Sequence, residues 1–362
     1  MALFRRRETR ADLTLDQVLA PSDPTWSGVS VGPDQALRLA TVWGCVRLLA
    51  DTISTLPVDV YRQGSADPLP TPPLLVTPAA GQPRHDWLYQ VIASLLLRGN
   101  AYGLITARSG ATLLPSQVEL VHPDAVGVRR NGDGRVEYRI GGKPYEPEDV
   151  WHVRAYPMPG SLTGLSPVEY ARQAIGLGIA AEKYGAQFFG DGATPSGILT
   201  SDRELNGQLA DSLSKSWQAL HSGRHKVAVL SGGLTFKPVS IAPEESQFIE
   251  TQRWTVSQVA RVFGVPPEMV GGESGGSLTY ANVESRALDY LRYSVQPWLV
   301  RLETALSALL PRQQYVKFNA GGLLRATTRE RYEAHAVALA AGFLTLDEVR
   351  ALEDLPALGD PS

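Results

Sequence analysis

The sequence predicts an α+β protein, in which antiparallel strands and long helices occupy different stretches of the chain. Two observations predict this fold class. Strand-like runs with alternating apolar residues cluster between residues 117 and 155, and long helical patterns follow at 166–189, 244–263 and 281–310. Because 362 residues exceed what one compact core usually holds, we expect two or three structural units.

The composition is that of an ordinary globular protein and carries no strong charge signal. Hydrophobic residues make up 43% of the chain, charged residues make up 20%, and the formal net charge is -3. A protein that grips DNA through its phosphates needs a basic face, which the whole-chain charge does not provide. No run approaches the roughly 20 apolar residues of a membrane span, so no membrane partner is predicted.

The N-terminal 155 residues predict alternating helices and strands. The single cysteine, Cys45, excludes an intrachain disulfide and has apolar neighbours, which predicts a buried thiol. The first helix should bury one apolar face, comprising Leu39, Trp43, Val46, Ala50 and Ile53. The elements expected in order are a loose arm at 1–30, a helix at 33–53, a strand at 58–62, a Pro-rich loop at 63–83, a helix at 86–98 that stops at Gly99, and strands at 100–107, 118–121, 126–130, 136–140 and 150–154. A hairpin turn is expected at 131–134, which reads Asn-Gly-Asp-Gly.

The remaining residues predict long helices separated by a small inserted unit and a Gly-rich loop. Pro297 should kink the helix at 281–310, whose expected buried stripe is Ala287, Leu291, Ser294, Trp298, Leu302, Ala305 and Leu309. The helix at 244–263 should present one apolar face, made by Ile249, Val256, Ala260 and Phe263. The other elements expected are a strand at 197–200, a helix at 202–221, a hairpin of 227–230 with 234–239, a flexible loop at 271–277, a strand at 315–318, and helices at 328–341 and 345–352.

One motif resembles the nucleophile turn of a serine hydrolase. Residues 272–276 match G-x-S-x-G, with Ser274 at the nucleophile position and His335 as the histidine that follows it. That turn requires a strand immediately before it and a helix immediately after it. Pro266, Pro267 and a Gly-rich run precede this one, so we favour a flexible loop, and a hydrolase using Ser274 remains the alternative.

Two further motifs lack the context that their chemistry needs. Residues 176–181 match the dinucleotide fingerprint G-x-G-x-x-A, but they lie inside a helical pattern with no preceding strand, so we expect the small residues to allow close helix packing. His221 and His225 are four residues apart, but Gly223 separates them and no glutamate follows His221. We therefore predict no cofactor, no metal site and no enzymatic activity.

Six segments, in order along the chain, resemble motifs of the phage portal protein family of the Hong Kong 97-like type. Together they extend over about residues 36–355, and only Leu346 departs from the motif, which usually has asparagine there. The segments are 41–50 with Leu56-Pro57-Val58, Arg98-Gly99-Asn100-Ala101-Tyr102, Asp149-Val150-Trp151-His152-Val153-Arg154, Gly164-Leu165-Ser166-Pro167 with 192–197, 263–271, and 342–350.

The resemblance implies a ring of twelve identical subunits around a channel for double-stranded DNA. Such a ring lies at one vertex of the capsid in the virion, after assembly in the host cytoplasm. The implied fold has an α/β wing, long stem helices, a small α/β clip, a tunnel loop and a short helical crown. On this chain the regions are an N-terminal arm at 1–30, the wing at 31–163, stem helices at 164–194 and 244–265, the clip at 195–243, the tunnel loop at 266–280, a long wing helix and strand at 281–327, and the C-terminal helical region at 328–362.

The resemblance also implies partners and positions for their contacts. The partners are other copies of the chain, double-stranded DNA that passes non-specifically, the terminase large subunit, the head–tail connector and the major capsid protein. We expect contact between subunits at the stem residues Ile249, Val256, Ala260 and Phe263, and contact with terminase or connector at the clip residues Arg203, Glu204, Lys215, Arg224 and Lys226. The tunnel-loop residues expected to face DNA are Gly272, Glu273, Ser274, Gly275, Ser277 and Thr279.

Overall fold

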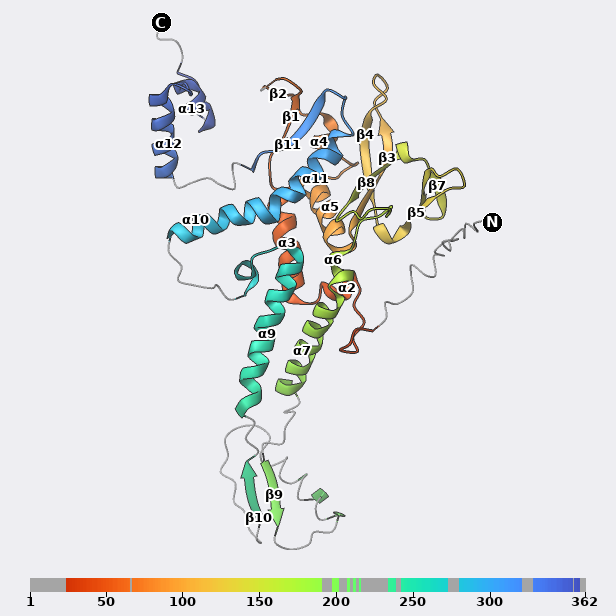
Figure 1. The fold of residues 1–362 in the computed structure, drawn as a ribbon, viewed down its shortest axis with the longest axis vertical. Coiled ribbons are helices and arrows are strands. Elements are labelled where there is room, and N and C mark those ends of the chain that lie inside the picture. Colours follow the sequence, from red (N-terminus) through yellow and green to blue (C-terminus); the bar gives the residue numbers. More distant parts are fainter. Residues whose placement is uncertain are drawn as a thin grey trace, which may run out of the picture.

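The computed structural model has an upper α/β body, two long helices below it and a two-stranded antiparallel sheet beyond their ends (Figure 1). The α+β class predicted from the sequence is therefore confirmed. The structure describes residues 24–65, 67–190, 197–201, 207–208, 211–212, 215, 234–238, 242–272, 280–320, 328–353 and 355–358. Within these residues, no helix is both long and apolar enough to cross a membrane.

The predicted first helix is two helices, α2 (Pro33–Ala36) and α3 (Ala40–Ser54). Leu39 has extended backbone angles (φ -73°, ψ 118°) just before α3, and this residue separates the two helices. The expected apolar face was wrong at Trp43, which is 49% exposed. The prediction of a buried thiol is confirmed, because Cys45 is completely buried.

The first sheet brings together strands of the upper body that are far apart in the sequence. The strand β1 (Val58–Arg62) pairs antiparallel with β11 (Gln314–Phe318) on one side and with β2 (Pro68–Leu69) on the other. The predicted loop at 63–83 was wrong in part, because it contains β2 and the short helix α4 (Pro73–Val76). Leu74 and Leu75 of α4 are buried, and packing against the body holds this turn of helix.

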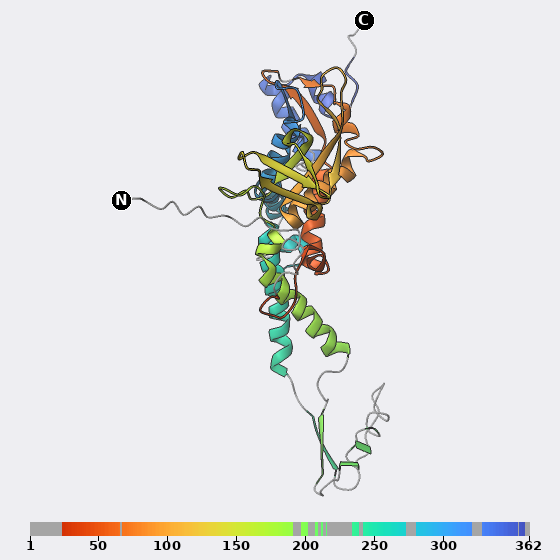
Figure 2. The same ribbon diagram turned by 90° about the vertical axis from the view of Figure 1, so that its right-hand side faces the viewer.

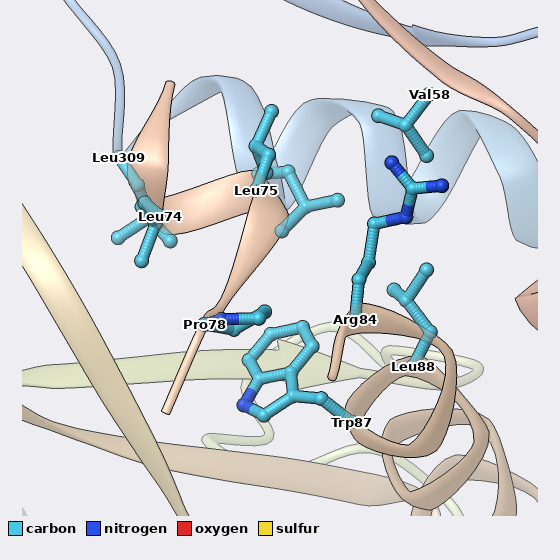
Figure 3. Close-up of a pocket in the computed structure, with 9 residues that line it drawn as sticks. Val58, Leu74, Leu75, Pro78, Arg84, Trp87, Leu88 and Leu309 are labelled. Atoms are coloured by element: carbon cyan, nitrogen blue, oxygen red, sulfur yellow. The ribbon is translucent and has the colours of Figure 1, made fainter. Parts of the chain in front are cut away.

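The helix α4 closes the core over the next helix, α5 (Arg84–Arg98) (Figure 3). Leu74, Leu75, Arg84 and Trp87 surround a hollow of about 10 Å³, room for one water molecule at most. The Trp87 indole N–H also donates to the backbone oxygen of Val118, at 2.9 Å. This hollow is therefore a packing feature, too small for a ligand.

Two small sheets follow α5, which ends as predicted at Gly99 in a left-handed conformation (φ 72°). The strand β3 (Asn100–Arg108) lies between β4 (Pro115–Val121) and β8 (Val150–Arg154). The predicted hairpin is confirmed, because β5 and β6 pair around residues 131–135. The second sheet consists of β5 (Val126–Arg130), β6 (Val136–Ile140) and the unpredicted β7 (Lys143–Tyr145). Two 3-10 turns adjoin it, η1 (Pro123–Ala125) and η2 (Pro147–Asp149).

The long helices α7 (Arg172–Gly190) and α9 (Ala242–Phe263) pack together at their upper ends (Figures 1 and 2). The short α6 (Pro167–Tyr170) precedes α7. Gly178 confirms the expected close packing, because a Cβ there would come within 2.8 Å of Thr255 on α9. Beyond the helices, β9 (Gly197–Ser201) pairs antiparallel with β10 (Leu234–Pro238), whereas the predicted partner at 227–230 and most of the predicted helix at 202–221 lie outside the described residues.

The predicted helix at 281–310 departs from regular α-helical geometry just before Pro297, where a kink was expected. It consists of α10 (Tyr280–Asp289), the π-helical segment η4 (Tyr290–Val295) and α11 (Gln296–Ser307). Its predicted stripe was wrong at Ala287, which is exposed because α10 extends away from the core (Figure 1). The C-terminal helices are α12 (Thr328–Ala341) and α13 (Leu346–Leu352), as predicted.

Candidate functional site

Three of the segments quoted for the family resemblance meet where the upper body joins α6. Asn100, at the start of β3, is 8% exposed and bonds to the backbone on both sides of this junction. Its amide nitrogen donates to the oxygens of Arg98 and Gly164, both at 3.1 Å, and its amide oxygen accepts from the Gly164 N–H at 2.7 Å. One side chain therefore fixes the loop that leads into the long helices.

His152 of β8 completes this network as a neutral imidazole. Because the amide oxygen of Asn100 is an acceptor, the Nε2–H of His152 donates to it at 3.0 Å, and Nδ1 accepts from the Tyr138 hydroxyl at 3.2 Å. Burial, with a smaller contribution from the charge of Arg154, lowers the pKa of His152 from 6.5 to about 3. Tyr102 stacks on the ring, with centroids 4.3 Å apart.

The same junction requires glycine and serine at specific positions. A Cβ at Gly164 would overlap the backbone oxygens of Ala155 and Gly99, so no other residue allows this approach. The Ser166 hydroxyl donates to the oxygen of Leu97 at 2.7 Å and accepts from the Glu169 N–H at 3.2 Å, which caps α6. The segments 98–102, 149–154 and 164–167 thus form one rigid joint.

The end of α9 leads into the Gly-rich segment through a second well-packed turn. Gly264 adopts a left-handed conformation (φ 67°), and its oxygen accepts a hydrogen bond of 2.5 Å from the Ser294 hydroxyl of η4. The 3-10 helix η3 (Pro267–Val270) follows and lies against Gly44 of α3. Glu268 of η3 pairs with Arg286 of α10 at 3.9 Å, so an ion pair joins the elements on either side of residues 273–279.

The serine-hydrolase alternative lacks its required geometry in the described residues. The segment before Gly272 is the 3-10 helix η3, whereas the nucleophile turn needs a strand there. The proposed histidine, His335, instead bonds to Glu353 through Nε2 at 3.1 Å, and Arg331 donates to the same carboxylate at 2.8 Å. That cluster ties α12 to the residue after α13.

The structure places only some of the predicted contact residues. Gly272 donates its N–H to the oxygen of Pro267 at 2.7 Å, and Lys215 is exposed in a helical conformation. On α9, Ala260 and Phe263 are buried within this one chain, and Val256 is half-buried, so these residues pack mainly inside the subunit. The side chain of Ile249 and the residues Glu273, Ser274, Gly275, Ser277, Thr279, Arg203, Glu204, Arg224 and Lys226 lie outside the described residues.

Sequence reasoning missed a strained aromatic residue beside the joint. Tyr156 has a left-handed backbone (φ 43°), uncommon for a residue with a side chain, and its ring meets Trp298 edge to face at 5.7 Å. Arg301 lies over both rings. Among the described residues, no three His, Cys, Asp or Glu side chains form a group suited to a metal ion. The described polar network thus positions helices, and it presents no set of side chains arranged for catalysis.

The model of the family described as phage portal protein matches residues 40–354. This chain belongs to the phage portal protein family. It is 34% identical to a "Probable portal protein" of Streptomyces phage phiC31, over 92% of this chain and 78% of that protein. It is 25% identical to the "Portal protein" of Enterobacteria phage HK97, over 91% of this chain and 81% of that protein.

Solved structures of related proteins have the same fold. A chain from the virion of a native gene transfer agent particle matches with a TM-score of 0.65 and 26% identity, over 90% of this chain and 94% of that one. A portal protein of the HK97 family from Corynebacterium diphtheriae matches with a TM-score of 0.58 and 20% identity, over 80% and 96% of the two chains. None of these relatives is named as an enzyme.

Proposed function

We propose that this chain is the subunit of a closed twelve-membered ring at one capsid vertex, through which double-stranded DNA enters and leaves. The family match over residues 40–354 carries this proposal. A structural neighbour with a TM-score of 0.62 belongs to the neck of a gene transfer agent particle described with C12 symmetry. In a cyclic ring each subunit presents two different faces to its neighbours, so no two-fold contact is needed.

The arrangement of elements supports the regional assignment. The upper body would be the wing (31–163, with 281–327), and α7 and α9 would be the stem (164–194 and 244–265). The two-stranded sheet of β9 and β10, beyond the far ends of both helices, would belong to the clip at 195–243. Residues 266–280 would be the tunnel loop, 328–362 a short crown and 1–30 an N-terminal arm.

The proposed channel guides DNA without holding it. Phosphate contacts multiplied around a ring would stall movement, and a chain with a net charge of -3 suits low friction. The loop residues Gly272, Glu273, Ser274, Gly275, Ser277 and Thr279 would face the DNA. The ion pair between Glu268 and Arg286 supports this placement, because it brings together the elements that flank residues 273–279.

The proposed partners act at the two ends of the stem. The clip, with Arg203, Glu204, Lys215, Arg224 and Lys226, would contact the terminase large subunit during packaging and the head–tail connector afterwards. The sequence contains no Walker A motif, so the energy for packaging would come from the terminase. The wing would contact the major capsid protein. Assembly would occur in the host cytoplasm before incorporation into the virion.

Native mass spectrometry with electron microscopy of negatively stained particles tests the ring. Twelve copies of the 39.1 kDa chain have a mass of about 469 kDa, and end-on views should show a central hole. In a packaging assay, deletion of residues 272–277 should reduce DNA packaging or retention while rings still form. Rings that package and retain DNA normally without these residues would contradict the proposed loop function.

A further inference from the structure

An apolar groove lies beside α6, next to the rigid joint. Its volume is about 310 Å³, and Tyr156, Pro167 and Val262 are among the residues that form its walls. The wall at Tyr156 is held from behind, because its ring contacts Trp298 and Arg301. An apolar cavity of about 150 Å³ is enough for a benzene ring, so this groove has room for a phenyl side chain. Such a preformed groove lowers the entropy cost of binding.

A polar pocket of about 290 Å³ adjoins the apolar groove. Leu165, Ser166 and Tyr170 line both hollows, so these residues form the border between them. Tyr170 is 71% exposed, and its ring is therefore accessible at this border. A peptide segment that lies across Tyr170 would meet an apolar surface on one side and a polar surface on the other.

The polar pocket carries an excess of negative charge. Its charged lining residues are Arg98, Asp124 and Glu169. The Arg98 side chain is largely buried, and its guanidinium bonds to Asp124 at 2.9 Å and to Asp34 at 3.5 Å. All three carboxylates are on exposed residues. Counting Arg154, whose charge reaches one wall of the pocket, three carboxylates are set against two arginines, so the pocket favours a cationic partner.

The N-terminal arm of this chain has the complementary sequence. Leu3 and Phe4 are adjacent bulky apolar residues, and residues 5–7 are the one run of three arginines in the chain. The order of apolar and then basic residues matches the groove and the pocket on the two sides of Tyr170. Arginine also stacks favourably on the face of a tyrosine ring.

The described part of the chain begins in a turn that is bound to α7, close to the groove. The Trp26 N–H donates to the amide oxygen of Gln173 at 3.0 Å. Gln173 is only two residues after Ala171, which lines the groove. The 16 residues at 8–23 can span up to about 50 Å when extended, so residues 3–7 can reach the groove of their own chain.

We propose that residues 3–7 bind across Tyr170 of the same chain, with Leu3 and Phe4 in the apolar groove and the three arginines at the acidic pocket. Covalent attachment raises the effective concentration of this segment at the groove, so weak individual contacts suffice. The bound arm would cover the apolar surface beside the rigid joint. This contact lies within one chain, so it does not depend on the proposed ring.

Photocrosslinking from the arm of the full-length protein tests the contact. The substitution of p-benzoylphenylalanine for Phe4 keeps a phenyl ring and couples it, on irradiation, to the groups that surround it. Trypsin should release the walls of the groove in the peptides 155–172 and 262–286, each of which follows an arginine and ends in one. We expect position 4 to crosslink to one or both peptides within single chains. Crosslinks only to other peptides, crosslinked dimers, or a folded protein without crosslinks would each overturn the proposal.

Two variants of the arm separate the effect of charge from that of proximity. The triple variant Arg5→Lys, Arg6→Lys and Arg7→Lys keeps the charge, and its crosslink yield should stay within about twofold of the unaltered arm. The triple change of the same residues to glutamate should lower the yield at least about fivefold, because the carboxylates of the pocket would repel the arm. Neither variant alters a described residue, so the circular dichroism spectrum should not change. Equal yields from the two variants would overturn the match of charge.

A reciprocal change in the pocket completes the test. Glu169→Lys should lower the crosslink yield of the unaltered arm and raise that of the glutamate arm, because it makes the pocket less negative. The peptide to be measured then ends at residue 169, where the new lysine adds a cleavage site. A yield that ignores Glu169→Lys with both arms would show that the arm does not lie at this pocket. The native mass that tests the ring is a separate measurement, so failure of one proposal is distinguishable from failure of the other.

Discussion

The imidazole of His152 donates to the amide oxygen of Asn100 across 3.0 Å, and this bond joins two strands to the start of the long helices. Asn100 in turn holds both backbone groups of Gly164. The three residues come from β3, β8 and the loop before α6, which lie far apart in sequence. A rigid joint built in this way would transmit a movement of α6 and α7 to the upper body instead of absorbing it.

Asn100→Ala should destabilise the subunit by about 2–4 kcal/mol, because the buried N–H and oxygen of Gly164 and the Nε2–H of His152 lose their partner. Urea unfolding at neutral pH measures the change. The control is Gln313→Ala at an exposed position, which should cost less than about 0.5 kcal/mol. Equal stabilities of the two variants would show that the hydrogen bonds of Asn100 do not stabilise the joint.

The stability of the subunit should depend on the protonation of His152. In the unfolded chain this residue has its ordinary pKa of 6.5, and in the folded chain burial lowers the pKa to about 3. Between pH 3 and pH 6.5, the unfolded state therefore binds a proton that the folded state does not. The stability of the folded state is thus unaffected by this residue above pH 6.5. It falls by about 1.4 kcal/mol per pH unit as the pH decreases from 6.5 towards 3. His152→Gln should remove this component from the measured pH dependence. Superimposable slopes for the two proteins would refute the assignment.

Gly178→Ala should destabilise the helix pair although alanine normally favours a helix by about 1 kcal/mol. The added Cβ would lie 2.8 Å from the Thr255 methyl carbon and 3.0 Å from a Leu39 methyl carbon, and such overpacking costs about 1–3 kcal/mol. Thr255→Ser removes that methyl group and keeps the hydroxyl that bonds to Thr251. The double variant should recover part of the loss. A stabilised single variant would mean that α7 and α9 do not approach this closely.

The thiol of Cys45 should be inert in the folded protein. It is completely buried, and burial raises its pKa from 9.0 to about 12, so the reactive thiolate is scarce at neutral pH. Titration with a chromogenic disulfide reagent should detect one thiol per chain in denaturant and almost none before unfolding. Rapid stoichiometric reaction of the native subunit would contradict the burial.

Local signals allowed much of the fold to be predicted from the sequence. The strands β5 and β6 have the predicted bounds because alternating apolar residues flank an Asn-Gly-Asp-Gly turn. The end of α5 was predictable since Gly99 provides a left-handed cap. The helix α4 was not, because prolines surround it and only burial of Leu74 and Leu75 stabilises it. The short β7 was also missed, because it depends on pairing with β6.

The candidate site was less predictable because it depends on contacts between distant segments. Helical periodicity counted Trp43 as a core residue, yet α3 already buries eight other side chains and has no room for it. The separate motifs around Asn100, His152 and Gly164 were recognisable, but their convergence depends on the pairing of β3 with β8. The left-handed Tyr156 gives no sequence signal, since glycine or asparagine is the usual residue in that conformation.

The pairing of β1 with β11 sets the order in which the protein can be completed. Val58 is synthesised about 260 residues before its partner Phe318. The central strand of this sheet, β1, therefore has one unpaired edge until about 250 further residues have been synthesised. Subunits truncated before residue 314 keep that edge open and should aggregate instead of joining rings. Completion of this sheet thus requires synthesis of the chain through β11.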